Sequence, residues 1–162
     1  MHLRPIVPQD REPLVALLRR IENFTPDEVD VAIELLDEAI ARPLQSGYRC
    51  IVAVEPLGTD EARLGYLCYG KTPMTEHTYD LYWIAVDPIA RGRGIGKALH
   101  GAFETTIVQE GAKNIRVETS KKESYDGTLR FYLDLSYIEC GRIPDFYRDG
   151  DDLVTLLRRV GV

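Results

Sequence analysis

Residues 86–97, with the sequence VDPIARGRGIGK, carry the clearest chemical signal in the chain. An apolar strand is predicted to end before this stretch, and an amphipathic helix is predicted to begin within it. Unpaired backbone amides and the dipole at such a helix start form a binding site for an anion. Arg91, Arg93 and Lys97 add cationic groups that pair with phosphate oxygens. Because the whole chain has a net charge of −6, this local cluster of cations indicates a phosphate-bearing ligand.

The spacing of the glycines in this stretch excludes two common phosphate loops. A Walker A loop, G-x-x-x-x-G-K-[ST], needs glycine where Arg91 stands and serine or threonine where Ala98 stands. A dinucleotide fingerprint, G-x-G-x-x-G, does not match glycines that are spaced two apart. These glycines, which let a pyrophosphate approach the main chain closely, are Gly92, Gly94 and Gly96. A turn that only starts a helix remains the alternative, although it leaves the clustered arginines unexplained.

The pattern Arg91-x-x-Gly94-x-Gly96 resembles the acetyl-coenzyme A signature of the GNAT superfamily of N-acetyltransferases, [RQ]-x-x-G-x-[GA]. Upstream, residues 84–88 (IAVDP) look like the fourth strand of that family. Downstream, residues 130–137 (RFYLDLSY) are similar to its FY-x-x-x-GF segment, at the expected distance after the predicted strand NIRVETS. The resemblance implies one GNAT domain over residues 1–162 and an acetyl-CoA-dependent N-acetyltransferase.

The resemblance also implies how the cosubstrate acetyl-CoA is held. The main chain of the fourth strand would pair with the pantetheine arm like an added strand, and its donors near Ala85 or Val86 could bind the thioester oxygen. The amides of the loop that follows would hold the pyrophosphate, with Arg91 nearby. The implied cofactor-binding residues are Ile84, Ala85, Val86, Arg91, Gly92, Arg93, Gly94, Ile95, Gly96 and Lys97.

Two catalytic roles follow from the same resemblance. Tyr132 occupies the tyrosine position of the FY segment and would protonate the departing thiolate, since a phenol with a pKa of about 10 stays protonated at neutral pH. Asp80 stands at the start of the fourth strand, where some relatives carry a carboxylate that acts as base through water. Alternation along the strand places Asp80 on one face with Ile84 and Val86. Glu118 on the next strand is the rival base, and either carboxylate could instead be solvated, as Tyr132 could be a core aromatic.

Two segments make the acceptor side harder to predict. Ser136-Tyr137 stands where the family usually has Gly-Phe, and a non-glycine residue in the left-handed turn costs about 1 kcal/mol. The sequence therefore does not fix the residue at which the helix that carries Tyr132 ends. Residues 143–152 combine aromatic and acidic side chains, and could line an acceptor pocket for a cation or form a solvated hairpin turn.

The hydrophobic pattern predicts a mixed α/β fold. Strands are predicted over residues 3–7, 48–54, 62–69, 79–86, 114–120, 137–143 and 152–157. Helices are predicted from a cap at Asp10, from Thr25 to Pro43, over 94–110 and over 126–135. Together with the GNAT resemblance, this order implies a mixed, mostly antiparallel sheet of about seven strands, splayed between the fourth and fifth strands and flanked by about four helices.

Composition excludes other kinds of function. The acidic balance argues against nucleic-acid binding, and no apolar run approaches the ~20 residues needed to cross a membrane. The three cysteines and three histidines are scattered, which predicts neither a disulfide framework nor a metal site. The N-terminal residues lack a signal-peptide pattern, so a cytoplasmic location is expected. The expected acceptor is a primary amine of a small molecule or peptide, and homodimers are common in proteins with this resemblance. The alternative function is a non-catalytic module that senses acyl-CoA.

Overall fold

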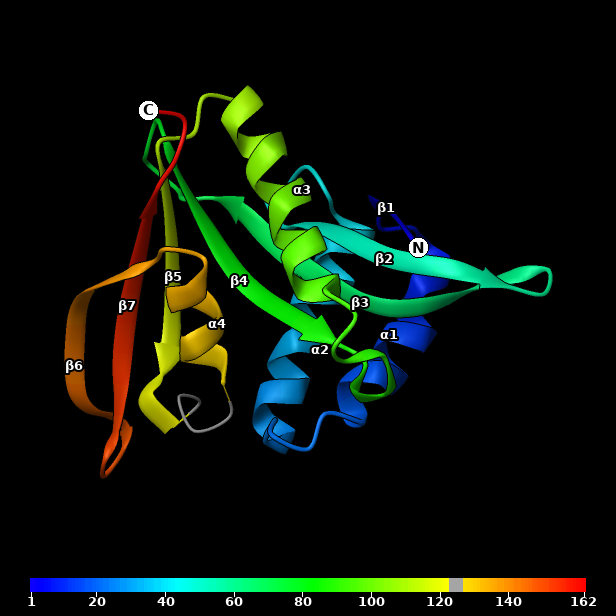
Figure 1. Cartoon of the computed structure of the whole chain (residues 1–162), viewed down its shortest axis with the longest axis horizontal. Coiled ribbons are helices and arrows are strands. Elements are labelled where there is room, and N and C mark those ends of the chain that lie inside the picture. Colours follow the sequence, from blue (N-terminus) through cyan, green and yellow to red (C-terminus); the bar gives the residue numbers. More distant parts are fainter. Residues whose placement is uncertain (123–126) are drawn as a thin grey trace.

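The computed structural model describes residues 1–122 and 127–162, which form a seven-stranded sheet with helices on both faces (Figure 1). The strands lie in the order β1-β2-β3-β4-β5-β7-β6. Their bounds are β1 (His2–Pro5), β2 (Arg49–Leu57), β3 (Asp60–Lys71), β4 (Thr78–Val86), β5 (Asn114–Ser120), β6 (Ile138–Arg148) and β7 (Asp151–Arg159). The α-helices of the described part are α1 (Arg11–Arg19), α2 (Pro26–Ala41), α3 (Ile95–Gln109) and α4 (Thr128–Asp134).

The predicted fold class is confirmed by the pairing of the strands. Neighbouring strands are antiparallel except β4 and β5, which run parallel. These two pair only where residues 78–80 face residues 114–116, and beyond this point they diverge toward their C-terminal ends (Figure 1). The sheet is therefore splayed between the fourth and fifth strands.

Each face of the sheet carries a pair of helices and its own apolar core. On one face, which we call the α3 face, Leu99 and Phe103 of α3 pack with Tyr132 of α4. On the other, the α1 face, Leu14 of α1 and Leu36 of α2 pack against the strands. The gap between β4 and β5 lies between these two layers of helices.

A β-bulge in β4 overturns the predicted arrangement of its side chains. Tyr82 is an extra residue that has no opposite partner on β3. Because one extra residue reverses the alternation of faces beyond it, the two halves of the strand are out of phase. Asp80 lies between two residues buried in the α3 core and so points to the α1 face, whereas Ile84 and Val86 pack toward the α3 face. The prediction that Asp80 shares a face with these two residues is wrong.

Asp10 does not cap α1 as predicted. No cap hydrogen bond forms, and the carboxylate is fully buried, where it accepts from Arg4 at 2.8 and 2.9 Å and from Arg63 at 2.9 Å. Although burial alone would raise its pKa, hydrogen bonds from Arg4, Val7 and Arg63 lower the pKa of Asp10 below its ordinary value. Because Arg63 lies 53 residues away in the sequence, local cap patterns contain no sign of this role.

The C-terminal hairpin is longer than predicted. β6 continues to Arg148 and β7 starts at Asp151, so most of the predicted loop over 143–152 is strand. β6 is exposed along its whole length, so it carries no buried alternation from which its extent could be predicted. The predicted start of the fourth helix at residue 126 lies outside the described residues, and α4 begins at Thr128.

Candidate active site

The divergence of β4 and β5 opens a cavity of about 320 Å³ at the C-terminal end of β4. We call it the fork cavity. Residues of the α1–α2 segment, β4, the loop after β4, and α4 with the glycine before it line the cavity. Four predicted cofactor-binding residues (Ile84, Ala85, Val86 and Arg91) and the predicted acid Tyr132 are among them. β4 pairs with β5 only through residues 78–80. On the side of β4 that faces the fork, the main chain of residues 81–86 therefore has no neighbouring strand, although β3 pairs with it on the other side.

Asp87 anchors the loop that follows β4. Its carboxylate accepts from the backbone N–H of Ile89 at 3.2 Å and pairs with Arg20 at the end of α1. Its own N–H donates to the carbonyl of Leu64 on β3 at 2.8 Å. Asp87 is buried, and these contacts fix the start of the loop to both the sheet and α1. The loop therefore enters α3 in a defined direction.

The start of α3 has the properties expected of an anion site. Gly94 is the N-cap with φ +74°, a left-handed conformation that favours glycine, and no side chain caps the helix. The amides of the first turn, residues 95–97, thus have no capping side chain to bond with. Gly96 lies against α4, since a Cβ built there would stand 3.2 Å from Cε2 of Phe131. A side chain at position 96 would press on the Phe131 ring, which would have to shift by a few tenths of an ångström.

The three cations of the loop differ in what they contact. Arg93 forms a bidentate pair with Glu55 at 2.6 and 3.2 Å, and this hydrogen bonding lowers the pKa of Glu55. Arg93 is thus held toward β2 by a carboxylate. Arg91 and Lys97 are exposed, and Arg91 lines the fork cavity. Of the loop arginines, Arg91 has the better position for a ligand in that cavity.

The C-terminal end of α4, at residues 135–137, fixes the main chain of Tyr132. Ser136 adopts a φ of +64°, so serine takes the left-handed position that the family pattern gives to glycine. The N–H of Tyr137 then donates to the carbonyl of Tyr132 at 3.0 Å and closes the helix. Tyr132 itself is 5% exposed and lines the fork cavity, with its ring against those of Phe131 and Tyr137. The replacement of Gly-Phe by Ser136-Tyr137 therefore preserves the end of the helix.

Asp80 is engaged in structural contacts. Its carboxylate accepts from Arg116 on β5 at 2.6 and 3.2 Å and from the hydroxyl of Thr72 at 2.8 Å. The pKa of Arg116 is raised chiefly by this hydrogen bonding. Asp80 and Arg116 are also the last residues at which β4 and β5 pair. The ion pair thus ties the two strands together where they begin to diverge.

Glu118 lies on the part of β5 that has already diverged from β4, whereas Asp80 lies at the last pair between these strands. It is two residues beyond Arg116 on β5, so it points to the same α1 face. Its side chain is 49% exposed, with one oxygen 3.8 Å from Arg116. Glu118 and Tyr132 both line a small cavity of about 80 Å³, which shares residues with the fork cavity. The rival carboxylate, rather than Asp80, therefore shares a cavity with the tyrosine.

A further cavity of about 420 Å³, the outer cavity, continues from Glu118 toward the β6–β7 hairpin. Trp83 lines both this cavity and the small one, and its buried Nε1 has no hydrogen-bond partner among the described residues. Tyr147 of the hairpin and Asp27 of α2 also line the outer cavity. Sequence reasoning gave no role to Trp83 or Asp27. For the hairpin side of the cavity, the aromatic and acidic residues of 143–152 were the available signal, and Tyr147 and Asp151 do line it.

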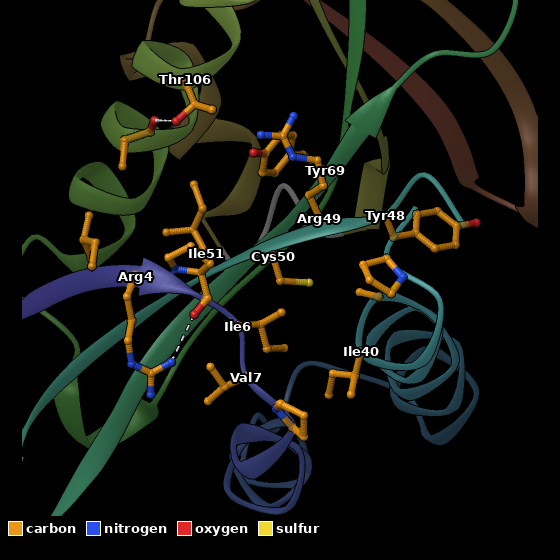
Figure 2. Close-up of a pocket in the computed structure, with 16 residues that line it drawn as sticks. Arg4, Ile6, Val7, Ile40, Tyr48, Arg49, Cys50, Ile51, Tyr69 and Thr106 are labelled. Atoms are coloured by element: carbon orange, nitrogen blue, oxygen red, sulfur yellow. Dashed lines mark hydrogen bonds between the residues drawn. The ribbon is translucent and has the colours of Figure 1, made fainter. Parts of the chain in front are cut away.

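Another cavity, of about 430 Å³, shares no lining residue with the fork, small and outer cavities. It lies between β1, β2 and the ends of α2 and α3, and Ile6, Val7 and Ile40 are among the side chains around it (Figure 2). None of the predicted site residues lines it. Arg4, at its edge, is already bound by Asp10 and Glu61. The size of this cavity alone does not make it the reaction site.

The described residues 1–122 and 127–162 contain no group of three or more histidine, cysteine or acidic side chains arranged to hold a metal ion. No helix in that part of the chain has both the length and the apolar character needed to cross a membrane.

Comparison with known proteins bears on this arrangement. A sequence model of the acetyltransferase (GNAT) family matches residues 16–137. A crystal structure of a protein from Desulfovibrio desulfuricans, described as a GNAT-family acetyltransferase, is 37% identical, covers 98% of both chains and has a TM-score of 0.89. The crystal structure of an aminoglycoside 6′-N-acetyltransferase with coenzyme A has a TM-score of 0.74 over 98% of this chain and 97% of that chain, but at 16% identity it supports the fold alone.

Curated sequences give a similar result. N-alpha-acetyltransferase RimI of Mycobacterium tuberculosis is 28% identical over 159 residues, which cover 94% of this chain and 96% of that protein. An uncharacterised protein of Mycobacterium leprae is 29% identical over 161 residues. The match covers 93% of this chain but 42% of the M. leprae protein, so this chain spans less than half of that protein's length. Since the family match extends over residues 16–137 and the fold agrees along nearly the whole chain, this protein belongs to the acetyltransferase (GNAT) family.

Proposed function

We propose that this protein transfers the acetyl group of acetyl-CoA directly to a primary amine of a small molecule or a peptide. The observation that carries the proposal is the meeting of three features at the fork cavity. These are the main-chain edge of β4 that β5 leaves unpaired, Arg91 of the loop that leads into the uncapped start of α3, and Tyr132. An acetyl-CoA-dependent transfer needs a slot for the pantetheine arm, an anion site for the pyrophosphate and a proton donor near the sulfur.

The residues present fit acetyl-CoA as cosubstrate. Main-chain groups of residues 84–86 would bond with the pantetheine amides, because they face the fork without a strand beside them. The uncapped amides of residues 95–97, the helix dipole and Arg91 would hold the pyrophosphate. Arg93, which the sequence places in the same site, would have to leave Glu55 to join them.

Proton transfers would be divided between two side chains. Glu118 would take a proton from the acceptor ammonium, directly or through water, because it lies on the small cavity beside Tyr132. The amine nitrogen would then form a bond to the acetyl carbon while the carbon–sulfur bond breaks, and the acylated nitrogen would release its remaining extra proton to solvent to leave a neutral amide. Tyr132 would give its hydroxyl proton to the departing thiolate and regain one from solvent. Of the two predicted bases we favour Glu118, since Arg116 and Thr72 already occupy the Asp80 carboxylate.

The outer cavity would admit the acceptor. Asp27, Glu118 and Asp151 line it together with one arginine, Arg148, so carboxylates predominate there and favour a cation. Its volume of about 420 Å³ suits a small molecule or the first residues of a peptide. The names of RimI and of the aminoglycoside acetyltransferase indicate that proteins similar to this chain act on amines.

The test combines binding with turnover. Calorimetry with coenzyme A and a thiol-release assay with acetyl-CoA would be run over a panel of peptide, polyamine, aminoglycoside and metabolite amines. We expect coenzyme A to bind and at least one amine to release thiol, with a one-to-one yield of acetylated product by mass spectrometry. Binding without turnover on any amine would support the alternative acyl-CoA sensor, and absence of binding would exclude both functions.

A further inference from the structure

A buried hydrogen bond joins α3 to the segment that follows α4. The hydroxyl of Tyr137 and Nε2 of His100 lie 2.8 Å apart, and both residues are 2% exposed. They are surrounded by the apolar core of the α3 face. Burial lowers the pKa of His100 to about 4, so the imidazole is neutral at physiological pH. A proton on Nδ1, which lies 3.7 Å from an oxygen of Glu104, would leave Nε2 to accept from the Tyr137 hydroxyl.

The same tyrosine supports the ring of Tyr132. The two rings meet edge to face, with centroids 5.3 Å apart and planes at 69°. Tyr137 also holds the main chain of that residue, since its N–H donates to the Tyr132 carbonyl at 3.0 Å. Tyr137 thus contacts both the ring and the backbone of Tyr132, and His100 holds Tyr137 from the other side.

A second polar chain links the same elements. Arg158 of β7 donates to both carboxylate oxygens of Glu104 on α3, at 3.0 and 3.1 Å. Its Nη1 donates to the carbonyl of Leu135 at 2.6 Å, at the end of α4. The C-terminal end of α4 is therefore attached to α3 by two independent routes. α3 begins at the proposed pyrophosphate site, and His100 lies six residues after its Gly94 cap, less than two helical turns away.

We infer that His100 and Tyr137 are positioning residues, whose hydrogen bond sets the place of Tyr132 relative to the helix that would hold the cofactor. The inference rests on the proposed function, in which Tyr132 is the proton donor. A phenylalanine at position 137, as in the family pattern, would fill the core but could not bond with His100. A positioned acid loses rate steeply when it moves, since a shift of about 1 Å can cost about 100-fold.

Tyr137→Phe removes the hydroxyl and keeps the ring. We expect kcat to fall about 10- to 100-fold, while KM for acetyl-CoA and the dissociation constant of coenzyme A change less than about twofold. Tyr79→Phe is the matched control. Tyr79 is also buried in this core, and its hydroxyl donates to Glu110 at 2.8 Å just beyond the other end of α3. Tyr79→Phe should lower stability to a similar degree and leave kcat unchanged.

Two more variants separate positioning from the cost of an unpaired group. His100→Gln keeps a side-chain amide able to bond with Tyr137 and should retain most of kcat. The double variant Tyr137→Phe/His100→Leu removes both polar partners, so it should recover stability compared with Tyr137→Phe. Its kcat should stay low, because the link is still missing. Wild-type kcat in Tyr137→Phe, or recovery of kcat in the double variant, would overturn the inference.

A readout that needs no acceptor keeps the inference testable if the proposed function fails. With 3-fluorotyrosine introduced only at position 132, the fluorine resonance should broaden in Tyr137→Phe and keep its width in Tyr79→Phe. If wild-type protein binds coenzyme A but acetylates no amine, the proposed function fails while this result still decides whether position 132 is held. A label of unchanged width in Tyr137→Phe would show that the pair holds nothing.

Discussion

Replacing Asp80 by asparagine tests whether this carboxylate is a base or a clamp between β4 and β5. The carboxylate is 6% exposed and accepts two hydrogen bonds from Arg116 and one from Thr72. A hydrogen bond to a charged group contributes about 1.5–3 kcal/mol. The Arg116 side chain is 43% exposed and can return to water, so we expect Asp80→Asn to lower the free energy of unfolding by about 2 kcal/mol. For a chain of this length, that corresponds to a Tm lower by about 4–8 °C.

Urea titration measures that loss, and the pH profile of kcat/KM measures catalysis. Below the unfolding transition, we expect Asp80→Asn to keep kcat/KM within about threefold of wild type and to keep the acid limb of the profile. Arg116→Gln is the matched variant, because it breaks the same ion pair and leaves the carboxylate in place. It should lower stability by a similar amount, and it is a control for stability alone because Arg116 also lies 3.8 Å from Glu118.

The opposite pattern would refute the clamp. If Asp80→Asn unfolds like wild type but loses more than about 100-fold in kcat with a flattened acid limb, Asp80 is the base and the bulge does not keep it from the reaction.

Three other predictions concern the proposed site and its core. Glu118→Gln should lower kcat about 10²-fold and flatten the acid limb of the pH profile, and an unchanged limb would remove Glu118 as base. Tyr132→Phe should lower kcat by about 10²–10⁴ with unchanged coenzyme A binding by calorimetry; full turnover would reject the acid role. Burial lowers the pKa of His100 to about 4, so the unfolded chain takes up a proton first as pH falls. Stability from neutral His100 should be complete above about pH 6.5 and decrease by about 3 kcal/mol down to about pH 4. Urea titrations should show this slope in wild type and lose it in His100→Gln; an equal slope in both would assign it to other groups.

The cofactor side of the site was accessible from sequence because its residues are consecutive. Glycine spacing, clustered cations and the change from an apolar strand to an amphipathic helix all occur within residues 86–97. The start of α2 was equally local: the helix predicted from Thr25 begins there, and Thr25 and Glu28, three residues apart, cap it reciprocally. The splay of the sheet followed from the GNAT resemblance and is confirmed. Binding by the named residues stays a prediction.

The acid–base side could not be read in the same way. Alternation along β4 predicts the wrong face for Asp80, because the bulge at Tyr82 depends on pairing with β3 and leaves no sign in the strand itself. The partner of Asp80 is Arg116, 36 residues further along the chain. Likewise, the engagement of Arg93 by Glu55 depends on a contact across 38 residues.

Taken alone, the sequence indicated the family and the order of elements and predicted the place of an anion site, since each depends on residue types at short spacing. Tertiary structure decided which carboxylate shares a cavity with Tyr132, which arginine lines the fork cavity and how Tyr137 meets His100. These contacts join residues dozens of positions apart, and the register of strands and the packing of α3 against α4 bring them together. Burial then changes their chemistry, as it does for the imidazole of His100.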